Sequence, residues 1–134
     1  MSGKKKGLPK QFAKQYTDLL YMTPNKITAK DIAALFGGTY GLTIELWAEM
    51  DVLELVLPNQ NSMDFEPVDI AFKDPSDASF VKNRGIATIY SINLCQEDIP
   101  EAIPYLEQLV DKYSGFVCAD SEDFTPVYAG SSKI

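Results

Sequence analysis

IATIYSINLCQEDIPEAIPYLEQLVDKYSGFVCA, residues 86–119, contains the clearest elements of the chain. Residues 86–94 are rich in β-branched and aromatic side chains, which favour a strand, and their nearly continuous apolar character indicates a central place in a sheet. Apolar residues then recur at helical spacing until Gly115, a helix stop signal, and residues 116–119 form a second apolar run. Strand, helix and strand in this order predict a crossover connection and, with it, a parallel strand pair.

The start of this helix is marked by Asp98 and Glu101, which have the spacing of a capping box with Asp in place of the usual Ser or Thr. An interior proline removes a backbone hydrogen bond, so Pro104 favours a helix that begins near Glu101. The apolar face consists of Ala102, Ile103, Leu106, Leu109, Val110 and Tyr113.

The first half of the chain shows two helical patterns. Residues 8–22 place apolar side chains at three- and four-residue spacing and end at a Thr-Pro-Asn break, which predicts an amphipathic helix. Thr28 then has the position of an N-cap, and a short apolar edge runs from Ile32 to Phe36 before Gly37 and Gly38. We expect a short helix there. A strand-like segment follows it, which argues against a DNA-binding helix-turn-helix.

Residues 42–57 alternate between apolar and polar side chains, and the phase of the alternation changes at Asp51. This pattern predicts two half-buried strands joined near Asp51. A helix across residues 44–57 stays open as an alternative, because Leu46, Met50, Leu53 and Leu57 also fit helical spacing. Beyond a polar loop at 58–62, residues 68–72 predict a short strand and residues 73–77 a turn.

Together these patterns predict one α+β domain over residues 1–134, in which two N-terminal helices and one long C-terminal helix pack a small mixed or antiparallel sheet. Residues 1–7 are expected to form a flexible basic tail. No apolar stretch is long enough for a membrane span, and the N-terminus lacks the apolar region of a secretory signal. Two cysteines, Cys95 and Cys118, form no disulfide framework and are interpreted as buried side chains. A cytoplasmic location is expected.

The charge of the chain is unevenly distributed. Five of the twelve basic residues lie within the first fourteen positions, and no acidic residue precedes Asp18. The whole chain has a net charge of −7, whereas residues 15–134 carry seven basic and nineteen acidic residues, a difference of −12. Such a body repels phosphate backbones and attracts a basic protein. It therefore argues against direct nucleic-acid binding.

Several kinds of catalytic chemistry lack their residues. The chain has no histidine, which excludes Ser-His-Asp and Cys-His catalysis and any metal site that requires imidazole. The glycines at 37–41 lack the lysine and the strand-to-helix order of a P-loop. We expect no enzyme activity, no catalytic residue, no cofactor and no metal.

Two acidic clusters remain as candidate sites. The first lies in FVCADSEDFTPVY, residues 116–128, and the second consists of Asp64, Glu66 and Asp69. Aromatic anchors surrounded by acids suit a surface that steers a cationic partner, and this is the favoured interpretation. The alternatives are a solvated loop and a Mg²⁺ or Ca²⁺ site. The candidate partner-binding residues are Asp120, Glu122, Asp123, Phe124, Tyr128, Asp64, Phe65 and Glu66.

Trp47 alternates with Glu45 and Glu49, and a sheet face with these three residues is either exposed or covered by the first helix. We expect Trp47 to be covered, because large aromatic side chains are usually buried.

A small, acidic α+β chain with this closing helix, strand and acidic-aromatic segment (101–128) resembles the immunity proteins of bacterial polymorphic and contact-dependent toxin systems. The resemblance implies a protein that binds a cognate toxin domain, often a basic nuclease, and blocks it. A divalent-metal-dependent hydrolase that uses the carboxylates at 120–123 and a non-catalytic adaptor subunit are the alternative functions. The oligomeric state is left open.

Overall fold

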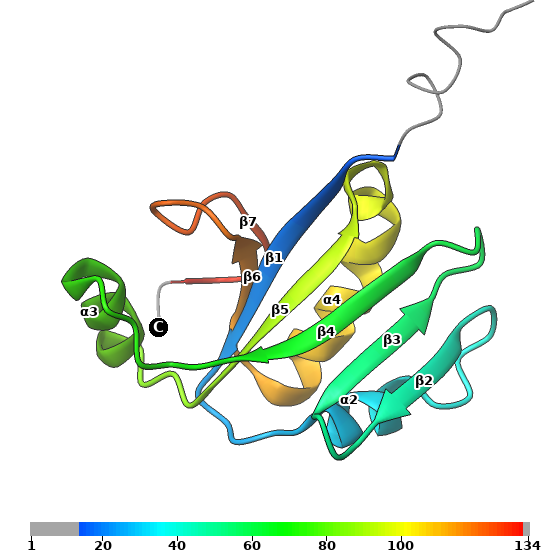
Figure 1. Ribbon diagram of the computed structural model, residues 1–134, viewed down its shortest axis with the longest axis horizontal. Coiled ribbons are helices and arrows are strands. Elements are labelled where there is room, and N and C mark those ends of the chain that lie inside the picture. Colours follow the sequence, from blue (N-terminus) through cyan, green and yellow to red (C-terminus); the bar gives the residue numbers. More distant parts are fainter. Residues whose placement is uncertain (1–13, 133–134) are drawn as a thin grey trace, which may run out of the picture.

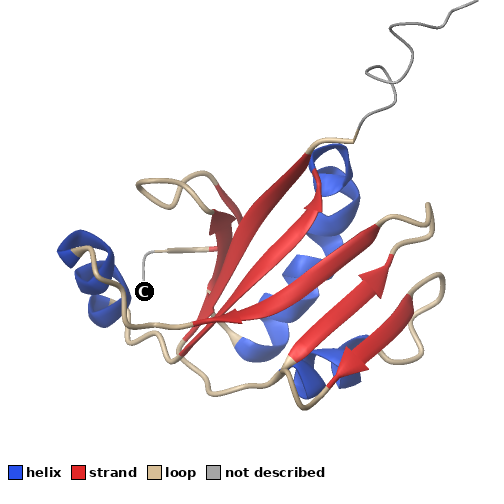
Figure 2. Ribbon diagram, viewed as in Figure 1, coloured by secondary structure: helices blue, strands red, loops and turns tan. Residues whose placement is uncertain are grey.

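The structure is a computed structural model, and it describes residues 14–132 (Figures 1 and 2). Its centre is a seven-stranded sheet in the order β2-β3-β4-β5-β1-β6-β7, and every pair of neighbouring strands is antiparallel. The α+β class is confirmed, with an antiparallel sheet. The strands are β1 (Tyr16–Thr23), β2 (Thr43–Trp47), β3 (Val52–Val56), β4 (Ser62–Val68), β5 (Thr88–Cys95), β6 (Phe116–Ala119) and β7 (Val127–Gly130).

Three α-helices are distributed over both faces of this sheet in the described chain. Helices α2 (Ala29–Phe36) and α4 (Ile99–Tyr113) pack on one face and enclose the main core, and Figure 1 shows both behind the sheet. Helix α3 (Pro75–Asn83) and the loop between β6 and β7 cover one end of the opposite face, over a smaller core built around Phe116 and Phe124. The rest of that opposite face has no helix on it (Figure 2).

The N-terminal helix predicted over residues 8–22 is wrong in the described part of the chain. Residues 8–13 lie outside the described residues, as does the predicted tail at 1–7, and Tyr16–Thr23 is a strand between β5 and β6. Leu19 and Tyr21 point into the main core, whereas Leu20 and Met22 point into the smaller one. A strand that is buried on both faces loses its alternation, and its apolar run then matches helical spacing equally well.

The short helix predicted after Thr28 is confirmed as α2. The Thr28 side chain accepts a hydrogen bond from the Asp31 backbone N–H at 3.3 Å, and the Thr28 N–H donates to Asp31 Oδ2 at 2.9 Å. This reciprocal pair is a capping box, which satisfies two N–H groups that the helix itself leaves unpaired.

Between residues 42 and 57 the structure confirms two strands and contradicts the helix alternative. Asp51 closes this hairpin with φ of 58°. Its Oδ1 accepts hydrogen bonds from the Ala29 N–H at 2.6 Å and the Tyr90 hydroxyl at 2.7 Å. The hairpin is therefore fixed to α2 and to the centre of the sheet.

The region between residues 58 and 85 was predicted less well. The strand expected at 68–72 is wrong, since β4 ends at Val68. The turn expected at 73–77 instead begins α3, where the Asp74 side chain accepts hydrogen bonds from the Ser76 and Asp77 N–H groups, and Pro75 opens the helix. Strand β4 was not predicted, because its charged residues Asp64 and Glu66 alternate with apolar ones and form a polar face on the strand.

Residues 86–119 contain the predicted strand, helix and strand, but the parallel pair is wrong. Strands β5 and β6 flank β1 and are each antiparallel to it, so the crossover skips one strand. The capping box at Asp98 is also wrong. The Asp98 side chain is buried and instead accepts hydrogen bonds from Asn59 at 2.9 Å and Asn61 at 2.8 Å. The helix begins at Ile99 and not near Glu101, so Pro104 lies inside it.

Candidate functional site: an acidic face of the sheet

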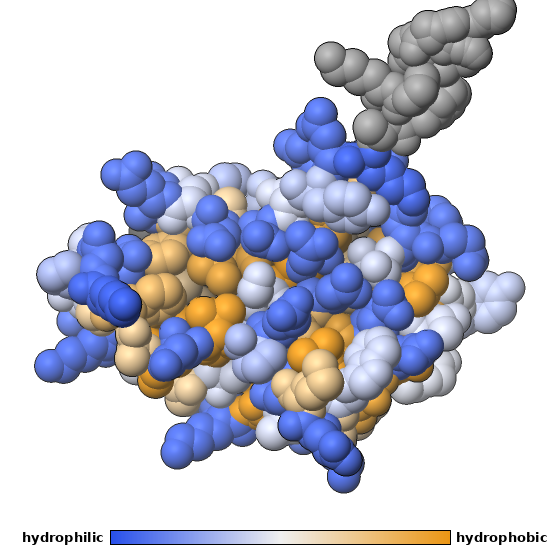
Figure 3. Space-filling model, in the orientation of Figure 1, coloured by the Kyte–Doolittle hydropathy of each residue, from blue (hydrophilic) through white to orange (hydrophobic). Residues whose placement is uncertain are grey.

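The side of strands β1 to β5 that faces away from α2 and α4 carries an unusual set of charges, and we call it the open face. Alternation along each strand places every acidic residue of the seven described strands on this side. None of these strands contains a lysine or an arginine. Figure 3 shows hydrophilic side chains spread over this face, with hydrophobic ones between them. The acidic residues are Asp18, Glu45, Glu54, Asp64 and Glu66.

Strand register brings most of these carboxylates into one line across the sheet. Glu45 lies opposite Glu54, Glu54 opposite Asp64, Asp64 opposite Asn93, and Asn93 opposite Asp18. We call these five residues the carboxylate row. With neighbouring strands about 4.8 Å apart, the row is about 19 Å long. The Asn93 amide donates to Asp18 Oδ1 at 2.9 Å.

Asp120 extends the row beyond β1. Its backbone N–H donates to the carbonyl oxygen of Asp18 at 3.2 Å, so the two residues are neighbours across the β1–β6 ladder. Burial raises the pKa of Asp120, and the negative charges of Asp18 and Asp77 raise it further. The predicted residue Asp120 therefore lies beside Asp18, at the β1 end of the row and directly after β6.

Asp64 lies near the middle of the row and is half-buried. Its Oδ1 is buried without a hydrogen-bond partner. Burial raises the pKa of this carboxyl, a hydrogen bond with Ser62 lowers it in part, and the charge of Glu66 raises it again. The second predicted cluster thus contributes Asp64 and Glu66 to the open face, whereas Asp69 lies beyond the end of β4.

The aromatic residues predicted as anchors are placed differently. Phe65 lies in the main core and Phe124 in the smaller one, where its ring is 4.6 Å from that of Phe80. Neither presents a surface to a partner. Tyr128 is half-buried against the main core. Trp47, which we expected to be covered, is 43% exposed on the open face, because no helix packs over β2 on that side.

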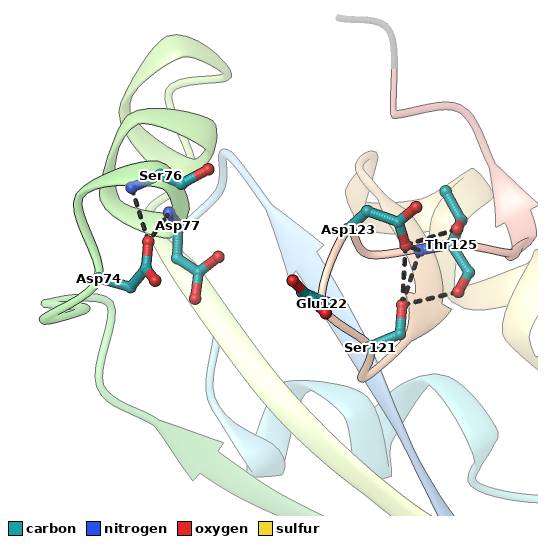
Figure 4. Close-up of a pocket in the computed structure, with 7 residues that line it drawn as sticks. All are labelled: Asp74, Ser76, Asp77, Ser121, Glu122, Asp123 and Thr125. Atoms are coloured by element: carbon teal, nitrogen blue, oxygen red, sulfur yellow. Dashed lines mark hydrogen bonds between the residues drawn. The ribbon is translucent and has the colours of Figure 1, made fainter.

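The remaining predicted acids, Glu122 and Asp123, line an open cleft of about 610 Å³ between the 121–125 loop and the start of α3 (Figure 4). Asp74 and Asp77 lie across the cleft. Ser121 and Thr125 donate side-chain hydrogen bonds to Asp123 Oδ1, and these bonds lower its pKa. Asp74 caps α3. Of the four carboxylates, Asp74 and Asp123 are therefore hydrogen-bonded within their own segments and stabilise the start of α3 and the 121–125 loop.

Within residues 14–132, no group of three or more Cys, Asp or Glu side chains is arranged to hold a metal ion. Both cysteines are buried, as expected, and burial together with the charge of Asp120 raises the pKa of Cys118 to about 12. No helix of the described chain has the length and apolar character to cross a membrane.

Four members of the row, Asp18, Glu45, Glu54 and Asn93, are not among the candidate residues predicted from the sequence. Glu45 and Glu54 each stand at a polar position between apolar neighbours of a predicted strand, so the alternation itself was a usable signal for these two acids. Asp18 has no such signal, because the apolar spacing of residues 8–22 predicts a helix. No protein-family model matches the chain, and neither the curated proteins nor the solved structures compared with it gave a match.

Proposed function

We propose that this chain is a non-catalytic, stoichiometric binding protein whose open face receives a basic protein. The carboxylate row is the observation that carries the proposal. Four carboxylates share a line with one asparagine across five strands, Asp120 lies at its end, and none of the seven described strands provides a positive charge. A cationic surface of a partner would be attracted to this face from a distance and oriented on it.

The row has an energetic cost that favours a binding role. Like charges directly opposite one another in neighbouring strands destabilise a sheet, by roughly 0.2–1 kcal/mol for each pair. Glu54 takes part in two such pairs, with Glu45 and with Asp64. A basic partner would remove this repulsion when it binds, so part of the binding free energy would come from the relief of electrostatic repulsion present in the free protein.

A toxin domain that acts on nucleic acid is the partner class that we propose. Such an enzyme needs a positively charged surface for its substrate, and the row presents charges of the same sign as a phosphate backbone. A protein seated on that surface would block the toxin, as the resemblance to immunity proteins implies. The location consistent with this role is the cytoplasm of the producing cell.

No specific observation favours the alternative of a metal-dependent hydrolase. In the described chain the carboxylates of the cleft are not grouped as metal ligands. An adaptor subunit would use a surface of this kind as part of a fixed assembly, and the experiment below separates the two binding roles.

The test is affinity capture of the full chain's partner from the native host at low and at high salt, followed by measurement of stoichiometry. We expect a basic protein, bound one-to-one, with an association rate that falls as salt rises. Restoration of the captured protein's own activity when the complex is dissociated would indicate an inhibitor. A partner of neutral or acidic charge, or a salt-independent association rate, would contradict the proposal, and a fixed multi-subunit assembly would indicate the adaptor role.

A further inference from the structure

Exposed apolar side chains gather around β2, the last strand of the sheet. Of the six large hydrophobic residues of the described chain that are exposed, four lie between residues 40 and 50. Tyr40 is 98% exposed, Met50 64%, Trp47 43% and Leu46 36%. Within the described residues β2 pairs with β3 alone, so its other side presents unpaired backbone groups, and Figure 1 shows the strand at the outer edge of the molecule.

The two edges of the sheet differ in how they are protected. Edge strands are usually shielded by lysine, proline, a bulge or very short length, because an unprotected edge can pair with another chain. At the β7 edge the ladder with β6 shifts register between Val117 and Cys118, and the strand has four residues. Strand β2 contains no lysine or proline and pairs with β3 in continuous register from Thr43 to Trp47.

We infer that an extended segment of the basic partner adds to β2 as an eighth strand; this rests on the proposed function and names the element by which the partner docks. The chemistry of β2 defines the segment. On the open face Glu45 would pair favourably with a lysine or arginine of the added strand. On the other face Ile44 and Leu46 would pair favourably with apolar residues. The segment therefore alternates basic and apolar side chains. Its basic residue continues the carboxylate row, and Trp47 packs beside it.

A second copy of this chain fits the same edge poorly. If two β2 strands paired antiparallel over their full length, Glu45 at the centre of Thr43–Trp47 would lie opposite Glu45 of the other copy. Two like charges directly opposed destabilise the pairing, while a lysine or arginine there would stabilise it. The same residue thus disfavours self-association and favours a basic partner.

The experiment uses a short peptide of alternating lysine and valine as the probe. Trp47 is the single tryptophan of the chain, so its fluorescence reports directly on this edge. We expect a blue shift of the emission and slower amide exchange at residues 43–47. A control peptide of the same sequence, with every internal amide N-methylated, keeps its charges but cannot pair, and its affinity should be at least about tenfold lower. The variant Glu45→Lys should bind the unmethylated peptide more weakly, to a similar extent. The variant Glu107→Lys, whose substitution is exposed on α4, should bind that peptide with unchanged affinity.

Equal affinity for both peptides, with no protection of residues 43–47, would overturn strand addition. If Glu54→Lys still weakened both peptides, the open face would remain the binding surface and the proposed function would stand. Absence of binding by either peptide would also overturn strand addition, and capture of the partner would then decide the proposed function separately.

Discussion

Replacement of Glu54 by Gln should stabilise the free protein. Glu54 lies opposite Glu45 on one side and Asp64 on the other, so the substitution removes two like-charge pairs from the sheet and keeps the side chain's size. At roughly 0.2–1 kcal/mol for each pair, the free energy of unfolding should rise by about 0.4–2 kcal/mol at low salt. In a chain of this length, a gain of about 1 kcal/mol raises the melting temperature by about 3–5 °C.

The assay is thermal and urea unfolding at neutral pH and low salt, repeated at about 1 M salt, where the Debye length falls to about 3 Å and the gain should largely disappear. Glu107→Gln is the matched control: it makes the same change in net charge on the far side of the molecule and relieves only the helical neighbour Asp111, which is worth a few tenths of a kcal/mol. A lower stability of Glu54→Gln, or a gain equal to that of the control, would refute the repulsion on which the account depends.

Three other outcomes follow from burial and backbone geometry. Because the pKa of Asp64 is raised in the folded state, the folded protein binds more protons than the unfolded one, and its stability should fall as the pH rises from the usual Asp range through the raised pKa. Asp64→Asn should remove part of this fall, measured as melting temperature against pH. A pH profile unchanged by the substitution would contradict the prediction. Cys95 and Cys118 should resist a thiol reagent at mildly alkaline pH until urea unfolds the chain, and rapid labelling of the native protein would argue against their burial. Gly115→Ala should lower the free energy of unfolding, measured in urea, by more than about 3 kcal/mol, because φ at Gly115 is 88° and the new Cβ would lie 2.0 Å from the Met22 carbonyl oxygen. A loss below about 1 kcal/mol would be inconsistent with this close contact.

The segments that could be predicted from sequence share one property, which is a local signal. The capping residues around Thr28, the change of phase at Asp51 and the apolar run at 86–94 each determine a local conformation, and the structure has a capped helix, a hairpin and strand β5 at these places. Strand β1 has no such signal. It is buried on both faces through pairing with β5 and β6, which are far away in sequence, and its apolar residues are compatible with a helix until that pairing is known.

The candidate site illustrates the same limit. Asp64, Glu66 and Asp120 were identified from their sequence neighbours, and Phe65 and Phe124 were identified for the same reason but face the two cores. The line from Glu45 to Asp18 depends on the register of four strand pairs. No local pattern reports that register, so the row becomes visible only when the sheet is assembled.

The most direct test of the account is the affinity of the captured partner for Glu54→Lys compared with Glu107→Lys. Both variants change the net charge equally, but only Glu54→Lys places a positive charge between Glu45 and Asp64 in the row. We predict that Glu54→Lys is at least as stable as the parent protein and binds the partner at least about tenfold more weakly, while Glu107→Lys binds as the parent does. Unchanged affinity of a folded Glu54→Lys variant would contradict the claim that the open face is the binding surface.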